Sequence, residues 1–173
     1  MIRNTKLYVN REEGFIGTSL RKDEYVCDCS DIDDLIVFTK DCKVVITKVG
    51  SKTFIAKNII HAAVFKKKDK RTIYNMIYKD GDKNFYYLKR FAVSGVTRDK
   101  VYDLSSAKKE SVVYYFSANP NGEAEIVSVL LRQVGSIKKL KWDIDFATIM
   151  IKGRASKGNL VTKHAVKRIE LKE

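Results

Sequence analysis

The chain has 173 residues, enough to bury a sizeable core, and 45% of them are hydrophobic, which argues against global disorder. Lys and Arg total 34 against 21 Asp and Glu, giving a formal net charge of +13 at pH 7. So much positive charge on a small folded chain indicates an anionic partner, with nucleic acid as the first candidate and a membrane surface as the second.

A membrane partner has little support in the sequence. No apolar run approaches the roughly 18 residues that span a bilayer, and no basic amphipathic helix stands out. Residues Met1–Lys6 lack the apolar stretch of a signal peptide and are as polar as an internal segment. We therefore expect no membrane association, and we expect the chain to be excised from a larger protein.

The three cysteines point to a reducing compartment. Cys27, Cys29 and Cys42 are odd in number and form no C-x-x-C pair, and the first two would share one face of a strand. This spacing is not typical of a disulfide framework. We expect a cytoplasmic protein.

One structural unit recurs along the chain: an apolar strand, a short polar turn, and a second strand that carries a basic residue. Five copies are visible, the first of them the weakest: 6–9 with 15–18, 35–38 with 44–48, 73–78 with 85–90, 112–116 with 124–129, and 149–151 with 160–163. Their turns recur roughly every 30 to 40 residues, a spacing typical of propellers and other repeat arrays. Asp80-Gly81 and Asn121-Gly122 predict tight hairpins.

The composition of the strands predicts how the repeats pack. Residues 73–78 and 112–116 are mostly apolar on both alternating faces, so each strand should be covered on both sides. Helical windows are scarce, since only residues 53–66 are ambiguous between helix and strand. With a single proline, Pro120, and no linker, we predict one all-β domain over residues 1–173, built of blades stacked face to face.

The basic residues recur with the repeats rather than gathering in a tail. For any single lysine a solvated surface is the simpler explanation, but an excess of one sign that recurs in register predicts a curved positive rim that contacts phosphates. Further basic pairs lie at Lys108-Lys109 and Lys138-Lys139. The candidate DNA-binding residues are Lys48, Lys66, Lys67, Lys68, Lys70, Arg71, Lys89, Arg90, Arg98, Lys100, Arg154, Lys157 and Lys163.

Other constellations favour structural explanations. Aromatic residues interleave with basic ones in 84–91, which is compatible with stacking on single-stranded bases through Phe85, Tyr86 and Tyr87, although a buried strand is favoured. The acidic cluster at 28–34 lacks the glycine and closing glutamate of a calcium loop, so a polar connection is favoured.

No catalytic or metal-binding pattern emerges from the sequence. The two histidines, His61 and His164, form no zinc pattern with the cysteines, and His61 lies in an apolar run where a structural role is expected. Residues 153–158 lack the G-K-[ST] ending of a phosphate-binding loop. We find no Ser/His/Asp or Cys/His arrangement, and we expect neither a metal nor a small-molecule substrate.

A resemblance to a known family is carried by the succession of repeats rather than by one motif. It covers essentially the whole chain and includes the segments DDLIVFTKDCKVVITKV, YNMIYKDGDKNFYYLKRFAVSGVTRDKVYDL, VYYFSANPNGEAEIV and IKGRASKGNLVTKHAVKRIEL. In these segments the chain resembles the C-terminal domain of the A subunits of bacterial type IIA topoisomerases, gyrase and topoisomerase IV. The resemblance implies a β-pinwheel, a propeller-like ring of about five four-stranded blades that exchange strands with their neighbours.

The resemblance also implies a function. In that family the domain binds and bends duplex DNA around a basic perimeter, within a chromosome-associated heterotetramer of A subunits and ATPase B subunits. The whole enzyme uses ATP and Mg²⁺ for strand passage, whereas the domain itself needs no cofactor. The active-site tyrosine lies in the preceding domain, so none of the nine tyrosines here is expected to be catalytic.

The choice within the family depends on a missing motif. Gyrases carry a basic box, Q-R-R-G-G-R-G, on the first blade, whereas the corresponding region here is residues 20–25, LRKDEY. We therefore favour topoisomerase IV, with gyrase as the alternative. Two other classes stay open: a protein-interaction propeller with an incidentally basic surface, and an RNA- or single-strand-binding β domain.

Overall fold

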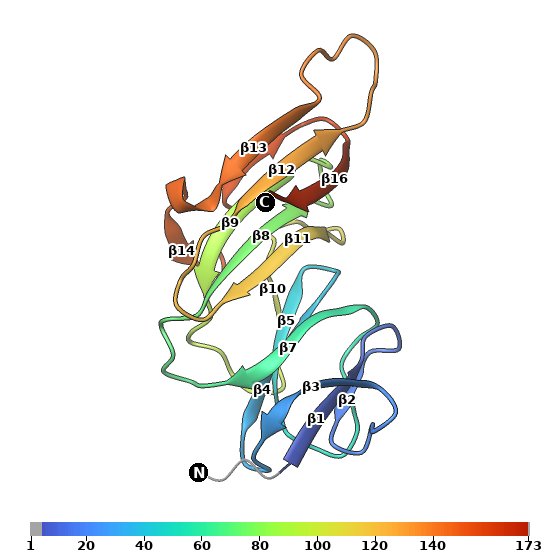
Figure 1. Cartoon of the computed structure of the whole chain (residues 1–173), viewed down its shortest axis with the longest axis vertical. Helices are drawn as coiled ribbons and strands as arrows, with labels where there is room; N and C mark the ends of the chain where they lie inside the picture. The colour runs from blue at the N-terminus through green and yellow to red at the C-terminus, as the bar shows by residue number, and fades with distance from the viewer. Residues whose placement is uncertain (1–4, 173) are drawn as a thin grey trace. The chain divides into compact units, whose positions relative to one another are not determined.

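The computed structural model describes residues 5–172, so Met1–Asn4, part of the segment expected not to be a signal peptide, lie outside the described residues. Sixteen β-strands make up the fold, and the 3₁₀ turn η1 (Phe146–Thr148) is the one helical element that the described part of the chain contains (Figure 1). None of its helices is long and apolar enough to cross a membrane. The all-β prediction is confirmed, and the two compact units of the chain, Met1–Asp69 with Ser94–Leu104 and Lys70–Val93 with Ser105–Glu173, are described separately.

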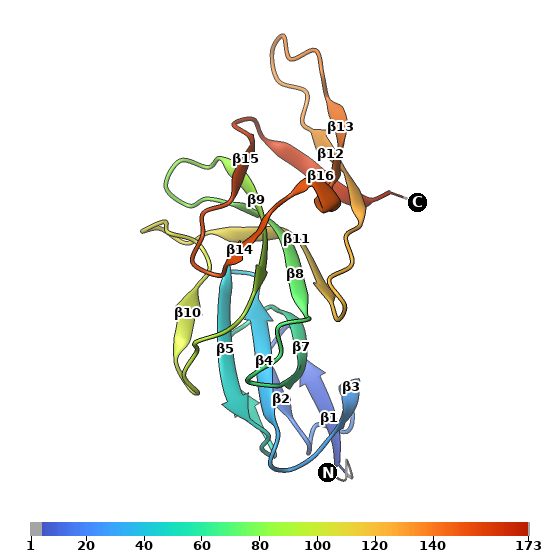
Figure 2. The ribbon, with the colours of Figure 1, turned by 90° about the vertical axis from the view of Figure 1, so that its left-hand side faces the viewer.

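The first unit consists of two antiparallel sheets. One has the order β3-β1-β2-β6, with β1 at Thr5–Asn10, β2 at Phe15–Gly17, β3 at Glu24–Cys29 and β6 at Thr53–Phe54. The other has the order β10-β5-β4-β7, with β4 at Asp34–Thr39, β5 at Lys43–Lys48, β7 at Ile59–Phe65 and β10 at Val101–Asp103 (Figure 2). The ambiguous segment 53–66 is therefore extended rather than helical.

The two sheets of the first unit enclose one apolar core. Leu7 of β1 and Ile16 of β2 lie in the same buried cluster as Leu35 and Val37 of β4 and Ile59 of β7. Because residues of both sheets meet in this cluster, the sheets pack face to face, as the apolar strand composition predicts.

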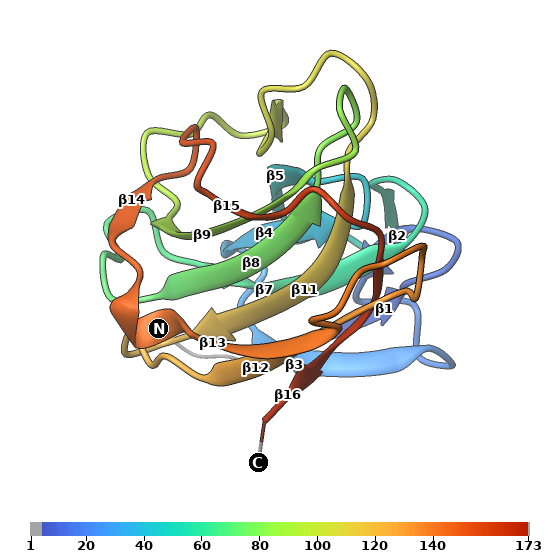
Figure 3. The ribbon, with the colours of Figure 1, turned by 90° about the horizontal axis from the view of Figure 1, so that it is seen from above.

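The second unit also has two sheets. In the first, β11 (Val112–Asn119), β8 (Ile73–Lys79) and β9 (Tyr86–Ala92) lie side by side (Figure 3). The free edge of β9 takes two further strands: β14 (Ile151–Gly153) pairs parallel at one end, and β15 (Asn159–Thr162) pairs antiparallel at the other. The second sheet has the order β13-β12-β16, with β12 at Ile126–Leu131, β13 at Lys141–Asp145 and β16 at Val166–Leu171.

Burial in the second unit confirms two covered faces for residues 73–78 and bears out the prediction only in part for 112–116, where Val113 is buried and the other four residues are half-buried. Every residue from Ile73 to Tyr78 is buried. Ile77 of β8 and Leu88 of β9 pack with Val127 of β12 and with Phe146, so the two sheets share a core.

The repeats form hairpins in the first three copies only. β1–β2, β4–β5 and β8–β9 are hairpins, as predicted. The expected hairpin at Asn121-Gly122 is wrong, because β11 pairs with β8 whereas β12 pairs with β13 and β16. The turn at Asn121-Gly122 carries the chain from one sheet into the next. The described residues form four sheets, whereas about five four-stranded blades are expected.

Candidate nucleic-acid interface

One end of the β10-β5-β4-β7 sheet collects basic residues from three separate stretches of sequence. Lys48 ends β5 and lies opposite Asp34 of β4. Asp34 also lies opposite Phe65, the last residue of β7, so the lysines 66–68 that follow β7 leave the sheet at the same end. The amide of Asp99 donates to the Ile46 carbonyl, which places the turn before β10 there as well. We call this group the basic end; its members are Lys48, Lys66, Lys67, Lys68, Arg98 and Lys100.

All six members of the basic end are exposed, but they differ in their surroundings. Arg98 makes a two-point ion pair with Asp34, with its Nε and Nη2 atoms 3.0 and 3.4 Å from the two carboxylate oxygens. Lys100 places its Nζ atom 5.2 Å from the centre of the Tyr102 ring. A phosphate would have to compete with Asp34 for Arg98, so the lysines are the better candidates for direct phosphate contact.

In the second unit the candidate residues lie in two places. Lys70 and Arg71 precede β8, and Arg71 donates from Nη2 to the side-chain oxygen of Asn121 at 2.9 Å. Lys163 follows β15, which pairs near the start of β9, and its Nζ atom lies 5.3 Å from the Phe85 ring centre. These groups lie at opposite ends of the β8–β9 pair, so they do not form one cluster.

Arg154 and Lys157 lie on the 153–158 loop, which joins β14 to β15 along the edge of β9. β14 leaves the edge after pairing with Ala92, and β15 rejoins it at Leu88, so the loop bridges the stretch in between. Lys157 is exposed, with its Nζ atom 4.8 Å from the Tyr87 ring centre, whereas Arg154 is half-buried.

Buried side chains hold the 153–158 loop in place. The Lys89 ammonium donates to the carbonyl oxygens of Arg154, at 2.6 Å, and Ser156, at 2.9 Å. The Tyr78 hydroxyl donates to the Lys157 carbonyl at 2.7 Å. Donors of the strands beneath the loop thus hold three of its carbonyls, so its exposed charges have a defined position.

The expectation that Lys89 and Arg90 lie on an exposed rim is corrected by their burial. Lys89 is 2% exposed and Arg90 5% exposed. Arg90 donates to the side-chain oxygen of Asn75 and to the carbonyls of Phe146 and Gly122. Their donors serve the interior of the unit, so neither side chain reaches a phosphate from this position, and we assign both a structural role.

The structure agrees with a buried strand for the aromatic segment and a polar connection for the acidic segment. Tyr86 and Tyr87 are buried within β9, so neither offers a ring to a single-stranded base. In the acidic cluster, Asp33 accepts from the Ser30 amide, and Asp34 pairs with Arg98. Among residues 5–172 no group of three or more His, Cys, Asp or Glu side chains is placed to hold a metal ion.

His61 has the structural position that its apolar surroundings predict. It lies on β7 opposite Phe38, with the two ring centres 6.0 Å apart. Burial, together with repulsion from Arg11, lowers the pKa of His61 to about 4, so the imidazole is neutral at physiological pH.

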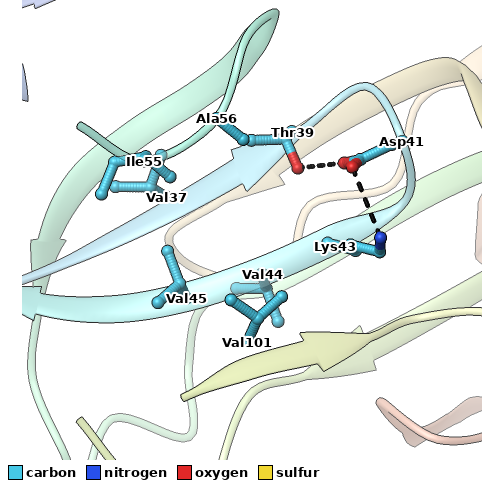
Figure 4. A pocket seen from close by; sticks show the side chains of 9 residues that line it. All are labelled: Val37, Thr39, Asp41, Lys43, Val44, Val45, Ile55, Ala56 and Val101. Carbon is cyan, nitrogen blue, oxygen red and sulfur yellow. Dashed lines mark hydrogen bonds and ion pairs between the residues drawn. The ribbon is translucent and has the colours of Figure 1, made fainter. Parts of the chain in front are cut away.

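A cavity in the first unit is too small for a nucleotide. It has a volume of about 30 Å³ and lies beside the β4–β5 hairpin (Figure 4). Apolar side chains, including Val37 and Val45, make up most of its lining. Asp41, which also lines it, accepts a hydrogen bond from the Thr39 hydroxyl and pairs with Lys43. This cavity has room for about one water molecule.

The architecture defines the class: an all-β fold of four mostly antiparallel sheets, of the β-pinwheel kind, with exposed clusters of lysine and arginine. A family profile described as "Topoisomerase C-terminal domain, Bacteroidota" matches residues 6–173. The chain belongs to this family of topoisomerase C-terminal domains.

Two further comparisons agree with this assignment. The A subunit of DNA topoisomerase 4 from Borreliella burgdorferi is 33% identical over 171 residues, which are 98% of this chain and 25% of that protein. The chain thus spans about a quarter of the length of this curated relative. A crystal structure of the C-terminal domain of DNA topoisomerase IV matches 99% of this chain and 62% of that chain, with a TM-score of 0.55 and 13% identity, which supports the shared fold.

Proposed function

We propose that the chain is the DNA-binding domain of the A subunit of a type IIA topoisomerase and that it binds duplex DNA through phosphates. The observation that carries the proposal is the basic end, where residues far apart in sequence gather six exposed cations. Membership in a family of topoisomerase C-terminal domains supports duplex DNA as the anion that such a surface would bind.

Contacts to phosphates explain why lysine and arginine dominate the surface. Each cation that neutralises a phosphate releases a counterion, which gives affinity without reading base sequence. Bending a 20–30 bp segment by 40–90° costs on the order of 1–6 kcal/mol, so several such contacts are needed to offset the bend. The proposed contacts are the basic end in the first unit and Lys70, Arg71, Arg154, Lys157 and Lys163 in the second.

Within the family we propose topoisomerase IV rather than gyrase. The sequence lacks the Q-R-R-G-G-R-G box, and the relative from Borreliella burgdorferi belongs to topoisomerase 4. The whole enzyme, cytoplasmic and chromosome-associated, would contain the B subunit, use ATP, and carry its catalytic tyrosine outside this chain. The full-length enzyme should relax and decatenate DNA; ATP-driven negative supercoiling would instead identify a gyrase.

The salt dependence of duplex binding tests the proposal. With roughly six to ten phosphate contacts, affinity for a 30-bp duplex of arbitrary sequence should fall about 10³- to 10⁵-fold between 50 and 200 mM salt. Fluorescence anisotropy of a labelled duplex measures this directly. An affinity that changes less than about tenfold over the same range would exclude a surface built on phosphates.

A protein-interaction role keeps some support from exposed apolar side chains along the edge of β9. Met150 is 72% exposed, and Ile151 and Leu160 are each about half exposed. Charge reversal of Lys89 and Arg90 is not an informative test of this alternative because both are buried. Charge reversal of the exposed Lys67 and Lys68 is an informative test. If duplex binding is unchanged in that variant, the protein-interaction role is favoured.

A further inference from the structure

An open hollow in the second unit lies between the β12–β13 connection and the segment that follows β15. It has a volume of about 450 Å³, which is within the range of sites for small organic groups. Its buried and half-buried lining residues, Leu131, Ile137, Trp142 and Thr162, form a mostly apolar floor, and its exposed lining residues, Lys138, Lys139 and His164, form a polar rim.

Trp142 is held in the floor by the β13-β12-β16 sheet. It lies opposite Val129 on β12, and Val129 lies opposite Ile169 on β16, so the three side chains point to one face. Trp142 packs against the buried cluster that contains Val129, yet it stays half-buried and lines the hollow. One part of its indole is therefore fixed by the core while another faces the opening.

The charged side chains that line the hollow are of one sign. Lys138 and Lys139 are exposed on its rim, and no carboxylate belongs to the described residues that line it. Two further cations are sequence neighbours of lining residues: Arg132 follows Leu131, and Lys163 precedes His164. Lys141 and Asp143 flank Trp142 on β13 and project from the opposite face of the sheet. A ligand that matches both floor and rim is flat and aromatic and carries negative charge on either side.

We propose that this hollow binds an unpaired base of a single strand of DNA, with the base on the Trp142 indole and the flanking phosphates at Lys138 and Lys139. Stacking suits a base because every base presents a flat face, and the backbone of a single strand continues on both sides of it toward Arg132 and Lys163. In a duplex the bases are already stacked on one another. Lys163 is also one of the proposed duplex contacts, but the site uses none of the residues of the basic end.

Trp142 is the only tryptophan in the chain, so its fluorescence reports on this site alone. The probe is a single-stranded oligonucleotide of about ten thymidines, compared with an abasic strand that has the same phosphates and no bases. We expect saturable quenching by the thymidine strand and a weaker affinity for the abasic strand, by roughly 5- to 150-fold for one stacked base. Equal affinity for the two strands, or unchanged emission at saturation, would overturn the proposal.

Two variants and a control separate stacking from charge. Lys138→Ala/Lys139→Ala should weaken binding of the thymidine strand while Trp142 still reports it. Trp142→Leu, which keeps an apolar side chain against Val129, should bind the two labelled strands equally well by anisotropy. The control Lys22→Ala/Lys57→Ala removes the same charge from exposed positions in the other unit and should leave the preference unchanged.

Affinity for a labelled duplex, measured on the same samples, shows that each variant is folded and keeps the two proposals distinguishable. Duplex binding without quenching by single strands would overturn only the proposal that the hollow binds an unpaired base. Quenching by single strands without salt-dependent duplex binding would overturn only the proposed function. A Trp142→Leu protein that retains the full preference for bases would place the stacking elsewhere and contradict the site.

Discussion

The two adjacent cations Lys89 and Arg90 are buried in β9, and backbone carbonyls account for most of their hydrogen bonds. Lys89 binds the carbonyls of Arg154 and Ser156, and Arg90 binds those of Phe146 and Gly122. A cation in the interior is retained only where acceptors replace its hydration, and each of these acceptors lies on a connection between strands. The charge thus holds loops together rather than attracting a ligand.

Replacing Lys89 tests this role. In Lys89→Met the side chain keeps its length but donates no hydrogen bond, so the carbonyls of the 153–158 loop lose a buried partner. We expect the free energy of unfolding to fall by about 1–3 kcal/mol in urea denaturation. The control Lys157→Met, which changes an exposed residue of the same loop, should stay within about 0.5 kcal/mol of the parent protein. A Lys89→Met protein as stable as the parent would contradict the role.

His61 makes stability depend on pH. Its pKa in the folded protein is about 4, against about 6.5 in an unfolded chain, so between these values only the unfolded state binds the proton. Stability therefore rises with pH across this window, and acidification from pH 6.5 to 4 should cost roughly 2–3 kcal/mol through this group. Urea titrations across the window should be flatter for His61→Asn, and parallel curves for the two proteins would refute the assignment.

The sequence shows which residues are basic, but its local pattern does not predict which of them are exposed. In the repeat pattern Lys48 and Lys89 occupy corresponding positions, near the end of the second strand of their repeats. Lys48 ends β5, whereas Lys89 lies in the middle of β9. What buries Lys89 is a loop 65 residues later in the chain, and no local pattern reports a contact at that separation.

At the scale of the elements, β14, the 153–158 loop and β15 act as one edge of the β9 sheet. The 153–158 loop can return to the edge of β9 because Gly158 takes a positive φ of 90°. A Cβ atom at this position would lie 2.2 Å from the Leu88 carbonyl oxygen. Only glycine permits both the left-handed backbone and the close approach. The loop that carries Arg154 and Lys157 therefore owes its path to one glycine and to the donors of β8 and β9.

A pair of glycine variants tests this dependence. Gly158→Ala should destabilise the protein by about 1–3 kcal/mol or more, because strain at positive φ adds to the clash with the β9 backbone. At Gly153, the other end of the loop, an added Cβ atom would meet no atom within 4 Å, so Gly153→Ala should be nearly neutral. Thermal and urea unfolding of both variants measure the difference, which should vanish if the loop is not packed on β9.

Local patterns predicted the hairpins and missed the exchange of strands between sheets. Asp80-Gly81 lies in the β8–β9 connection, as predicted, but the connection spans residues 80–85 and its positive φ is at Asn84 (60°) rather than at Gly81. Asn121-Gly122 also turns, with Gly122 at a φ of 73°, but the strands on either side of it join different sheets. Turn chemistry fixes the backbone over about four residues, whereas strand pairing is decided by burial against distant partners.

At the scale of the whole chain, the net charge of +13 has two separable consequences. It raises the general attraction to any polyanion, and where exposed basic residues gather it provides the proposed contacts to individual phosphates. The first depends on the number of charges, and the second depends on where they lie. The basic end assembles from three stretches of sequence, so its existence follows from the fold rather than from composition.

Two triple variants with the same net charge distinguish these consequences. Lys66→Ala/Lys67→Ala/Lys68→Ala removes three lysines of the basic end, and Lys22→Ala/Lys57→Ala/Lys83→Ala removes three exposed lysines outside the proposed contacts. If each lysine of the basic end neutralises one phosphate, the slope of log affinity against log salt should decrease in magnitude by about 0.9 per lysine, roughly 2 to 3 in all. The second variant should keep the slope of the parent. Equal losses in the two proteins would mean that total charge, and not the basic end, governs binding of the duplex.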